Sequence, residues 1–115
     1  MNAKELQENE TINRKMLKIQ QERKELNKQH LQVLKQEQKI LIKMQKNETL
    51  MCKVVKDTKA IAEINKLYKM SFKENMEEQK ILQELIKESQ TVITDITSEL
   101  KRIEKYKKEI SKNAK

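Results

Sequence analysis

The chain has 115 residues, of which 38% are charged, 36% are hydrophobic and 3% are aromatic. It contains no glycine or proline and carries a formal net charge of +8 at pH 7. So few bulky apolar side chains cannot build a private globular core, and the lack of turn-forming residues excludes a loop-rich domain.

One heptad frame, with positions a to g, runs from Ile12 to Ala114 without a change of phase. This pattern predicts an all-α protein: a long amphipathic helix that forms a coiled coil or multi-helix bundle by oligomerisation. A continuous helix is favoured over a hairpin, because a turn has no reason to conserve the phase. The predicted oligomer seam consists of the apolar residues at a and d: Ile12, Met16, Ile19, Leu26, Val33, Ile40, Met44, Met51, Val54, Ile61, Tyr68, Phe72, Leu82, Ile86, Ile93, Ile96, Leu100, Ile103 and Ile110.

Residues 1–30 are predicted to be a polar, helical N-terminal segment with a weak seam. Asn2 is placed to cap the first turn, and a glutamate follows three residues later, as in a capping box. Arg23, His30 and Glu37 occupy successive a positions, where each would face its own copy in a parallel, in-register homodimer. Either this stretch frays, or the partner helix is offset, antiparallel or different. An offset pairing would let Arg23 and Glu37 meet opposite charges.

Residues 31–88 are predicted to be the central coiled-coil or bundle segment. Apolar residues join the seam at e and g and widen the apolar face, as is typical of helices with more than one neighbour. Ile and Val at most of the apolar d positions favour a trimer or tetramer over a parallel dimer. The widened face comprises Leu34, Leu41, Leu50, Val55 and Ile64.

Three places are candidates for a helix break. Residues 47–49 include a poor helix former at a seam position and would form the turn of a hairpin. Residues 70–75 include a second capping-box spacing, and residues 89–98 have the lowest helix propensity of the chain.

Residues 89–115 are predicted to be a C-terminal coiled-coil segment with a basic end. This end either contacts a polyanion, nucleic acid included, or is a solvated helix terminus whose lysines favour the helix dipole. Only three of the 26 basic residues are arginine, so such binding would be charge-driven and tolerant of sequence. The basic cluster comprises Lys101, Arg102, Lys105, Lys107, Lys108, Lys112 and Lys115.

The sequence gives no support for an enzyme. It has one histidine, His30, one cysteine, Cys52, and no glycine-rich phosphate loop, so we expect no catalytic site, metal, cofactor or small-molecule substrate. A single cysteine excludes an internal disulfide, and no signal peptide or membrane-spanning run is evident. These features predict an intracellular protein of the cytoplasm or nucleus.

The leading hypothesis for function is a coiled-coil oligomerisation module, a scaffold that assembles protein partners. Its partner would be a second copy of the chain, another helical protein, or both. Two alternatives remain open: a nucleic-acid-associated assembly protein that uses its basic helix ends, and one helical subunit of a heteromeric tethering bundle.

Overall fold

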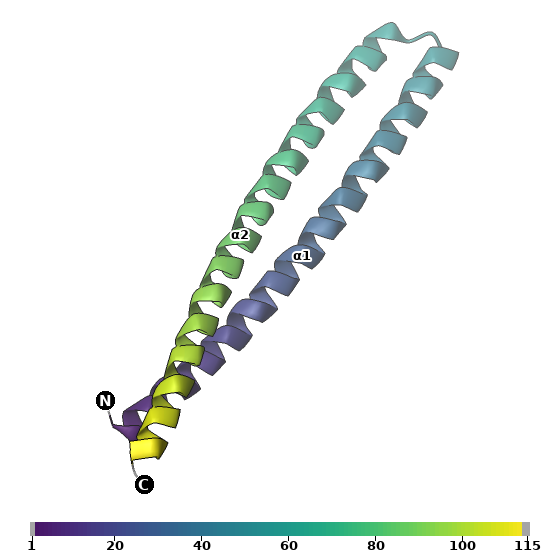
Figure 1. The fold of residues 1–115 in the computed structure, drawn as a ribbon. Helices are drawn as coiled ribbons and strands as arrows, with labels where there is room; N and C mark the ends of the chain where they lie inside the picture. The colour runs from purple at the N-terminus through teal and green to yellow at the C-terminus, as the bar shows by residue number, and fades with distance from the viewer. Residues whose placement is uncertain (1, 114–115) are drawn as a thin grey trace. The chain divides into compact units, whose positions relative to one another are not determined.

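The computed structural model describes residues 2–113, which form two long α-helices and, within that range, no strand. Helix α1 spans Ala3–Val54 and helix α2 spans Thr58–Asn113 (Figure 1). The all-α class is therefore confirmed. The expectation of one continuous helix is wrong, because residues 55–57 separate the two helices.

The chain divides into two units, each of which pairs a segment of α1 with a segment of α2. Residues 28–84 form the turn unit, in which α1 and α2 lie side by side and are joined by the turn (Figure 1). Met1–Asn27 and Leu85–Lys115 form the terminal unit. Within each unit the two helical segments run antiparallel.

The start of α1 follows the predicted cap. The backbone N–H of Glu5 donates to Oδ1 of Asn2 at 2.8 Å, and the N–H of Leu6 donates to the Asn2 carbonyl at 3.1 Å. The first bond satisfies an N–H group that has no backbone partner in the first turn, and the second is the first regular bond of the helix.

The turn is a Schellman motif followed directly by a helix cap. The N–H of Asp57 donates to the carbonyl of Cys52 at 2.9 Å, and the N–H of Lys56 donates to the carbonyl of Lys53 at 3.1 Å. Lys56 adopts the left-handed conformation, with φ of 58°, that this motif requires. Asp57 then caps α2, because its Oδ1 accepts the N–H of Ala60 at 3.0 Å.

Replacement of Lys56 with glycine is expected to stabilise the hairpin. A side chain at positive φ costs about 1 kcal/mol, part of which glycine loses again through its larger unfolded-state entropy. The Lys56→Gly variant should therefore gain about 0.5 kcal/mol in free energy of unfolding, measured by urea denaturation. The control Lys53→Gly, in the last turn of α1, should lose about 1 kcal/mol. A loss at both positions would contradict the geometry of the turn.

Two of the three predicted helix breaks fall where the helix is held by contacts to the other helix. Residues 47–49 lie within α1, and the Glu48 carboxylate lies close enough to the Tyr68 hydroxyl of α2 to shift its pKa. Burial and then this carboxylate raise the pKa of the Tyr68 hydroxyl above its usual value. Residues 70–75 lie within α2 and end at Asn75, whose side chain is bonded to α1. Tertiary contacts therefore override weak local propensity at both places.

The third predicted break, residues 89–98, is also helical. Thr91, Thr94 and Thr97 donate their hydroxyls to carbonyls four residues earlier, at 3.1, 2.9 and 2.7 Å. Ile96 is buried within this stretch. Packing of the isoleucine and these bonds make the segment compatible with a helix despite its β-branched residues.

The core of the turn unit combines apolar packing with a polar network. Leu34, Tyr68 and Leu82 are buried between the helices. Asn75 is 3% exposed and donates to the backbone carbonyl of Leu34 at 3.0 Å. Gln79 bonds both Asn75, at 2.6 Å, and Gln38, at 3.1 Å. A network with these partners fixes the register of α2 on α1, because a slip along the helix would leave buried amides unpaired.

The core of the terminal unit joins isoleucines of α2 to a mostly polar side of α1. Leu6, Ile96 and Ile103 are buried. Lys107 forms an ion pair with Glu10 and donates to Gln7 at 3.1 Å. The hydrogen bond from Lys107 is the main reason that the pKa of Glu10 lies below its usual value. One helix end is thereby attached to the other.

Candidate interaction surfaces

The predicted seam of α2 faces α1 within its own unit. All but one of its ten apolar residues are buried or half-buried, and the exception, Ile110, is 38% exposed near the end of the helix. The nine that pack inward are Ile61, Tyr68, Phe72, Leu82, Ile86, Ile93, Ile96, Leu100 and Ile103. This part of the seam is used by the hairpin itself.

The predicted seam of α1 faces solvent instead. All nine of its apolar residues are at least 45% exposed. We call this row, at the a and d positions from residue 12 to residue 54, the apolar stripe of α1. Its members are Ile12, Met16, Ile19, Leu26, Val33, Ile40, Met44, Met51 and Val54.

A different row of α1, shifted by one residue, packs against α2. We call it the inner row, and a shift of one residue turns it about 100° around the helix from the apolar stripe. Six of its fourteen residues are apolar, compared with nine of the thirteen positions in the apolar stripe. The inner row comprises Leu6, Glu10, Asn13, Leu17, Gln20, Lys24, Asn27, Leu31, Leu34, Gln38, Leu41, Gln45, Glu48 and Cys52. The more apolar row of α1 is thus the one without an intramolecular partner.

Helix α2 adds apolar residues beside the apolar stripe in each unit. In a pair of antiparallel right-handed helices, the g positions of α2 lie on the same side as the a and d positions of α1. Ile64 occupies such a position in the turn unit and is half-buried. Leu85 and Tyr106 do so in the terminal unit and are 39% and 48% exposed. Each unit therefore presents an apolar surface built from both of its helices.

The residues of the predicted widened face divide between the inside and the outside of the turn unit. Leu34 is buried, and Leu41 and Ile64 are half-buried. Leu50 and Val55 are 60% and 71% exposed. Leu34, Leu41 and Ile64 thus pack against the other helix of the hairpin. The widened apolar face is therefore explained in large part without a third helix.

The basic cluster of the C-terminus is spread around α2 rather than gathered on one side. Lys107 points inward to its ion pair with Glu10, and Arg102 pairs with Glu99 at 2.7 Å. The other described members, Lys101, Lys105, Lys108 and Lys112, are exposed, and Lys115 lies outside the described residues, as does the seam position Ala114.

A larger basic surface lies in the turn unit and was missed from the sequence. Ten of the twelve lysines of this unit lie on the side of the helix pair opposite the apolar stripe, and all ten are exposed. We call this surface the lysine face. It comprises Lys28, Lys35, Lys39, Lys46 and Lys53 of α1 with Lys59, Lys66, Lys69, Lys73 and Lys80 of α2. The signal was present as lysines spaced seven residues apart, which is easily overlooked beside the denser C-terminal cluster.

Other kinds of site find no support within residues 2–113. No three His, Cys, Asp or Glu side chains in this range are grouped so as to hold a metal ion. None of the described helices has a stretch apolar enough to cross a membrane. The chain matches no protein-family model, no curated protein and no solved structure. Functional inference therefore rests on the two surfaces, the apolar stripe and the lysine face.

Proposed function

We propose that this protein is a helical-hairpin assembly module, which self-associates through the apolar stripe of α1 and so brings attached or bound molecules together. The observation that carries the proposal is the exposure of nine large apolar side chains in one heptad register. A row of this length on a folded chain is typical of a helix that has a further helical partner.

The charges within the apolar stripe favour a second, antiparallel copy as that partner. When α1 is paired with an antiparallel α1 so that Ile12 lies opposite Met51, the stripes overlap from end to end. The same register places Glu37 of one copy opposite Leu26 of the other. Arg23 then lies three residues, or about 4.5 Å along the axis, from that glutamate.

A parallel copy would fit less well. It would place Arg23, His30 and Glu37 each opposite its own counterpart, with two like-charge contacts in the seam. The antiparallel register instead offers two oppositely charged pairs, related by the two-fold axis of an isologous dimer. Two hairpins also supply four helices, which agrees with the preference of the β-branched d positions for a bundle of three or four helices over a parallel dimer.

Measurement of molar mass by light scattering after size exclusion, over a wide range of loading concentrations, tests the proposal. We expect a mass of two chains of 13.8 kDa at high concentration and a fall toward one chain on dilution. A mass of one chain at every concentration, with helicity retained, would contradict self-association. In that case another helical protein becomes the candidate partner for the apolar stripe.

A further inference from the structure

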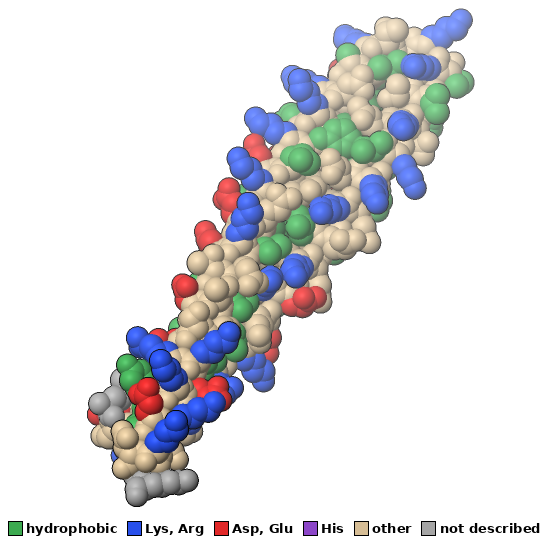
Figure 2. Space-filling view, in the orientation of Figure 1, with side chains coloured by type: hydrophobic (Ala, Val, Ile, Leu, Met, Phe, Trp, Pro, Cys, Tyr) green, Lys and Arg blue, Asp and Glu red, His purple; other side chains and the backbone are tan. Residues whose placement is uncertain are grey.

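We propose that the lysine face of the turn unit binds the phosphate backbone of duplex nucleic acid without reading its sequence. This site is separate from the apolar stripe, and it differs from the basic C-terminus that the sequence suggested. Figure 2 shows the arrangement on this side of the turn unit: blue side chains follow both helices, and the red ones lie along the outer edge of α2.

Lysines of the two rows line two neighbouring hollows, one between the helices and one on α2, which share Met76 and Gln79. Lys35 and Lys39 of α1 line the first together with Ile42, Met76 and Gln79. On α2, Lys73 and Lys80 lie around the same methionine.

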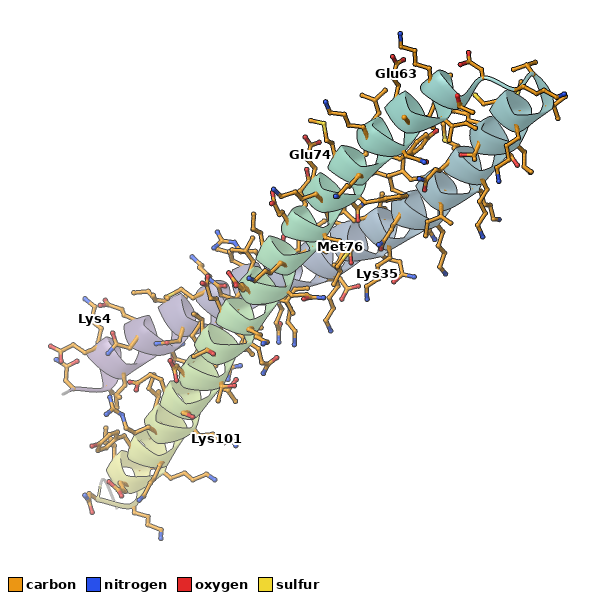
Figure 3. The ribbon with its side chains drawn as sticks, turned by 90° about the horizontal axis from the view of Figure 1, so that it is seen from above. Lys4, Lys35, Glu63, Glu74, Met76 and Lys101 are labelled. Atoms are coloured by element: carbon orange, nitrogen blue, oxygen red, sulfur yellow. The ribbon has the colours of Figure 1, made fainter. Side chains whose placement is uncertain are left out.

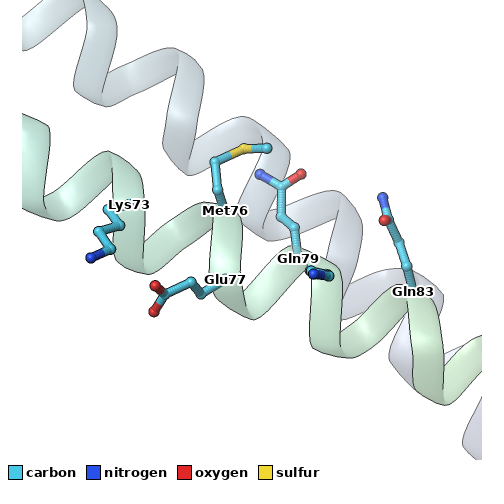
Figure 4. Close-up of a pocket in the computed structure, with 6 residues that line it drawn as sticks. Lys73, Met76, Glu77, Gln79 and Gln83 are labelled. Atoms are coloured by element: carbon cyan, nitrogen blue, oxygen red, sulfur yellow. The ribbon is translucent and has the colours of Figure 1, made fainter.

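Side-chain directions agree with this grouping for Met76 and Gln79. In Figure 3, Met76 lies between the helices near Lys35, whereas Glu63 and Glu74 extend from the far edge of α2. In the close-up of Figure 4, Met76 and Gln79 reach toward α1, and Glu77 points away from it. Lys73 also points away from α1 in this view, so its charge lies on the outer side of α2 beside Glu77.

The lysines of the lysine face form no ion pair within the described residues. Each of the ion pairs among residues 2–113 involves Arg14, Arg102 or Lys107, all in the terminal unit. The nearest carboxylates of the turn unit, Glu63, Glu77 and Glu84, follow the outer edge of α2 and border the lysine face. Of these, Glu77 lines the same hollow as Lys73 and Lys80. Ten unpaired, exposed ammonium groups repel one another, so a polyanion that occupies this surface relieves that repulsion.

The spacing of the charges suits a duplex. Lys59, Lys66, Lys73 and Lys80 recur every seven residues, or about 10.5 Å, along one line of α2. From Lys28 to Lys53 the face extends about 38 Å, comparable to one turn of duplex DNA. Ten charges over that length give roughly one per 3.8 Å, close to the one phosphate per 3.4 Å of each DNA strand.

The composition of the face argues for backbone contacts and against a membrane. It contains no arginine and no aromatic residue, so it lacks the side chains that read base edges bidentately or stack on bases. Its exposed large apolar residues, Ile42 and Met76, line the hollow between the helices. An anionic bilayer would attract the lysines, but firm attachment needs an apolar surface or a second anchor.

The test is titration of a mixed-sequence 30-base-pair DNA duplex with the full chain at several salt concentrations. In one variant Lys59, Lys66, Lys73 and Lys80 are replaced by glutamine. In the matched control Lys15, Lys43, Lys105 and Lys112, which are exposed and lie off the lysine face, are replaced in the same way. Both variants lower the net charge by four, so they differ only in which surface loses charge.

We expect the lysine-face variant to bind the duplex at least about 100-fold more weakly near 0.1 M salt. Its slope of log affinity against log salt should be shallower by about 3.6, for four lost phosphate contacts. The control should change affinity by less than about tenfold, and an unrelated duplex sequence should give the same values. If circular dichroism shows that the α2 variant has lost helix, glutamine at Lys35, Lys39, Lys46 and Lys53 tests the same face from α1.

Three outcomes would overturn the proposal. Equal losses in the two variants would mean that only net charge matters, and a larger loss in the control would move the site off the lysine face. Binding to vesicles with 30% phosphatidylserine in the absence of binding to DNA would identify an anionic lipid surface as the ligand instead.

Discussion

Replacement of Ile19 and Ile40 with aspartate is expected to convert the proposed dimer into monomeric hairpins that remain helical. Both residues lie in the apolar stripe and are more than half exposed in the single chain, at 54% and 57%. In the two-fold dimer the double substitution removes four buried isoleucines. At about 1.5 kcal/mol each, their loss corresponds to an increase in dissociation constant of more than 10⁴-fold.

The matched control uses positions of α1 that lie away from the apolar stripe. Gln21→Asp with Ile42→Asp introduces the same two charges, and Ile42 is itself an exposed isoleucine, at 40%. Sedimentation equilibrium should show the dimer retained in the control and lost in the stripe variant, with equal far-ultraviolet circular dichroism. Similar dissociation by both variants would show that the apolar stripe is not the interface.

Helix α1 has two rows of different role, the apolar stripe and the inner row, and sequence periodicity alone does not distinguish them. The a and d positions of α2, which the sequence predicts as an oligomer seam, pack within the chain, and Tyr68, Leu82, Ile96 and Ile103 are buried there. In α1 the same frame followed the apolar stripe, since it is richer in apolar residues than the inner row. Hydrophobic periodicity identifies the most apolar side of a helix, and it does not say whether the partner of that side is within the chain or outside it.

The turn was misplaced for a related reason. The unchanged heptad phase argues against a turn in the sequence. In the structure, however, this single frame joins the exposed apolar stripe of α1 to the a and d positions of α2, which face inward. The rows that pack together do change phase, by one residue, across residues 55–57. The turn also lacks its usual marker, because Lys56 stands where a glycine is most common, and only the capping residue Asp57 gives a local signal.

The lysine face shows why a basic surface can be missed in the sequence. The C-terminal residues have the highest density of lysine and arginine along the chain, but Lys107 and Arg102 are engaged in ion pairs. The lysines of residues 28–84 are sparser in sequence, and they lie on one side because their spacing is seven residues on two antiparallel helices. Their grouping depends on the hairpin, which the single-helix expectation did not include.

A dimer that forms through the apolar stripe would leave its lysine faces on the outside, where they can bind nucleic acid. Within the turn unit the apolar stripe and the lysine face lie on opposite sides of the helix pair, so an interface through one leaves the other open. Self-association would then present two lysine faces per dimer, and duplex binding would gain avidity when both engage the same polymer. Loss of the dimer through Ile19 and Ile40 should therefore weaken binding to long DNA more than binding to a short duplex.

Reversal of the charges at Arg23 and Glu37 distinguishes an antiparallel copy from every other partner of the apolar stripe. In the antiparallel register, Arg23→Glu places two carboxylates near each other on either side of the two-fold axis, and Glu37→Arg places two guanidinium groups there. Each single reversal is expected to weaken the dimer by at least about tenfold, because like charges replace opposite ones in a partly desolvated seam. The double reversal restores opposite charges in the same register and should recover most of the affinity, as measured by sedimentation.

A parallel homodimer would gain nothing from the double reversal, since each position would still face its own kind. If the double variant is as weak as the single variants, the register with Ile12 opposite Met51 is wrong and the stripe pairs in another way.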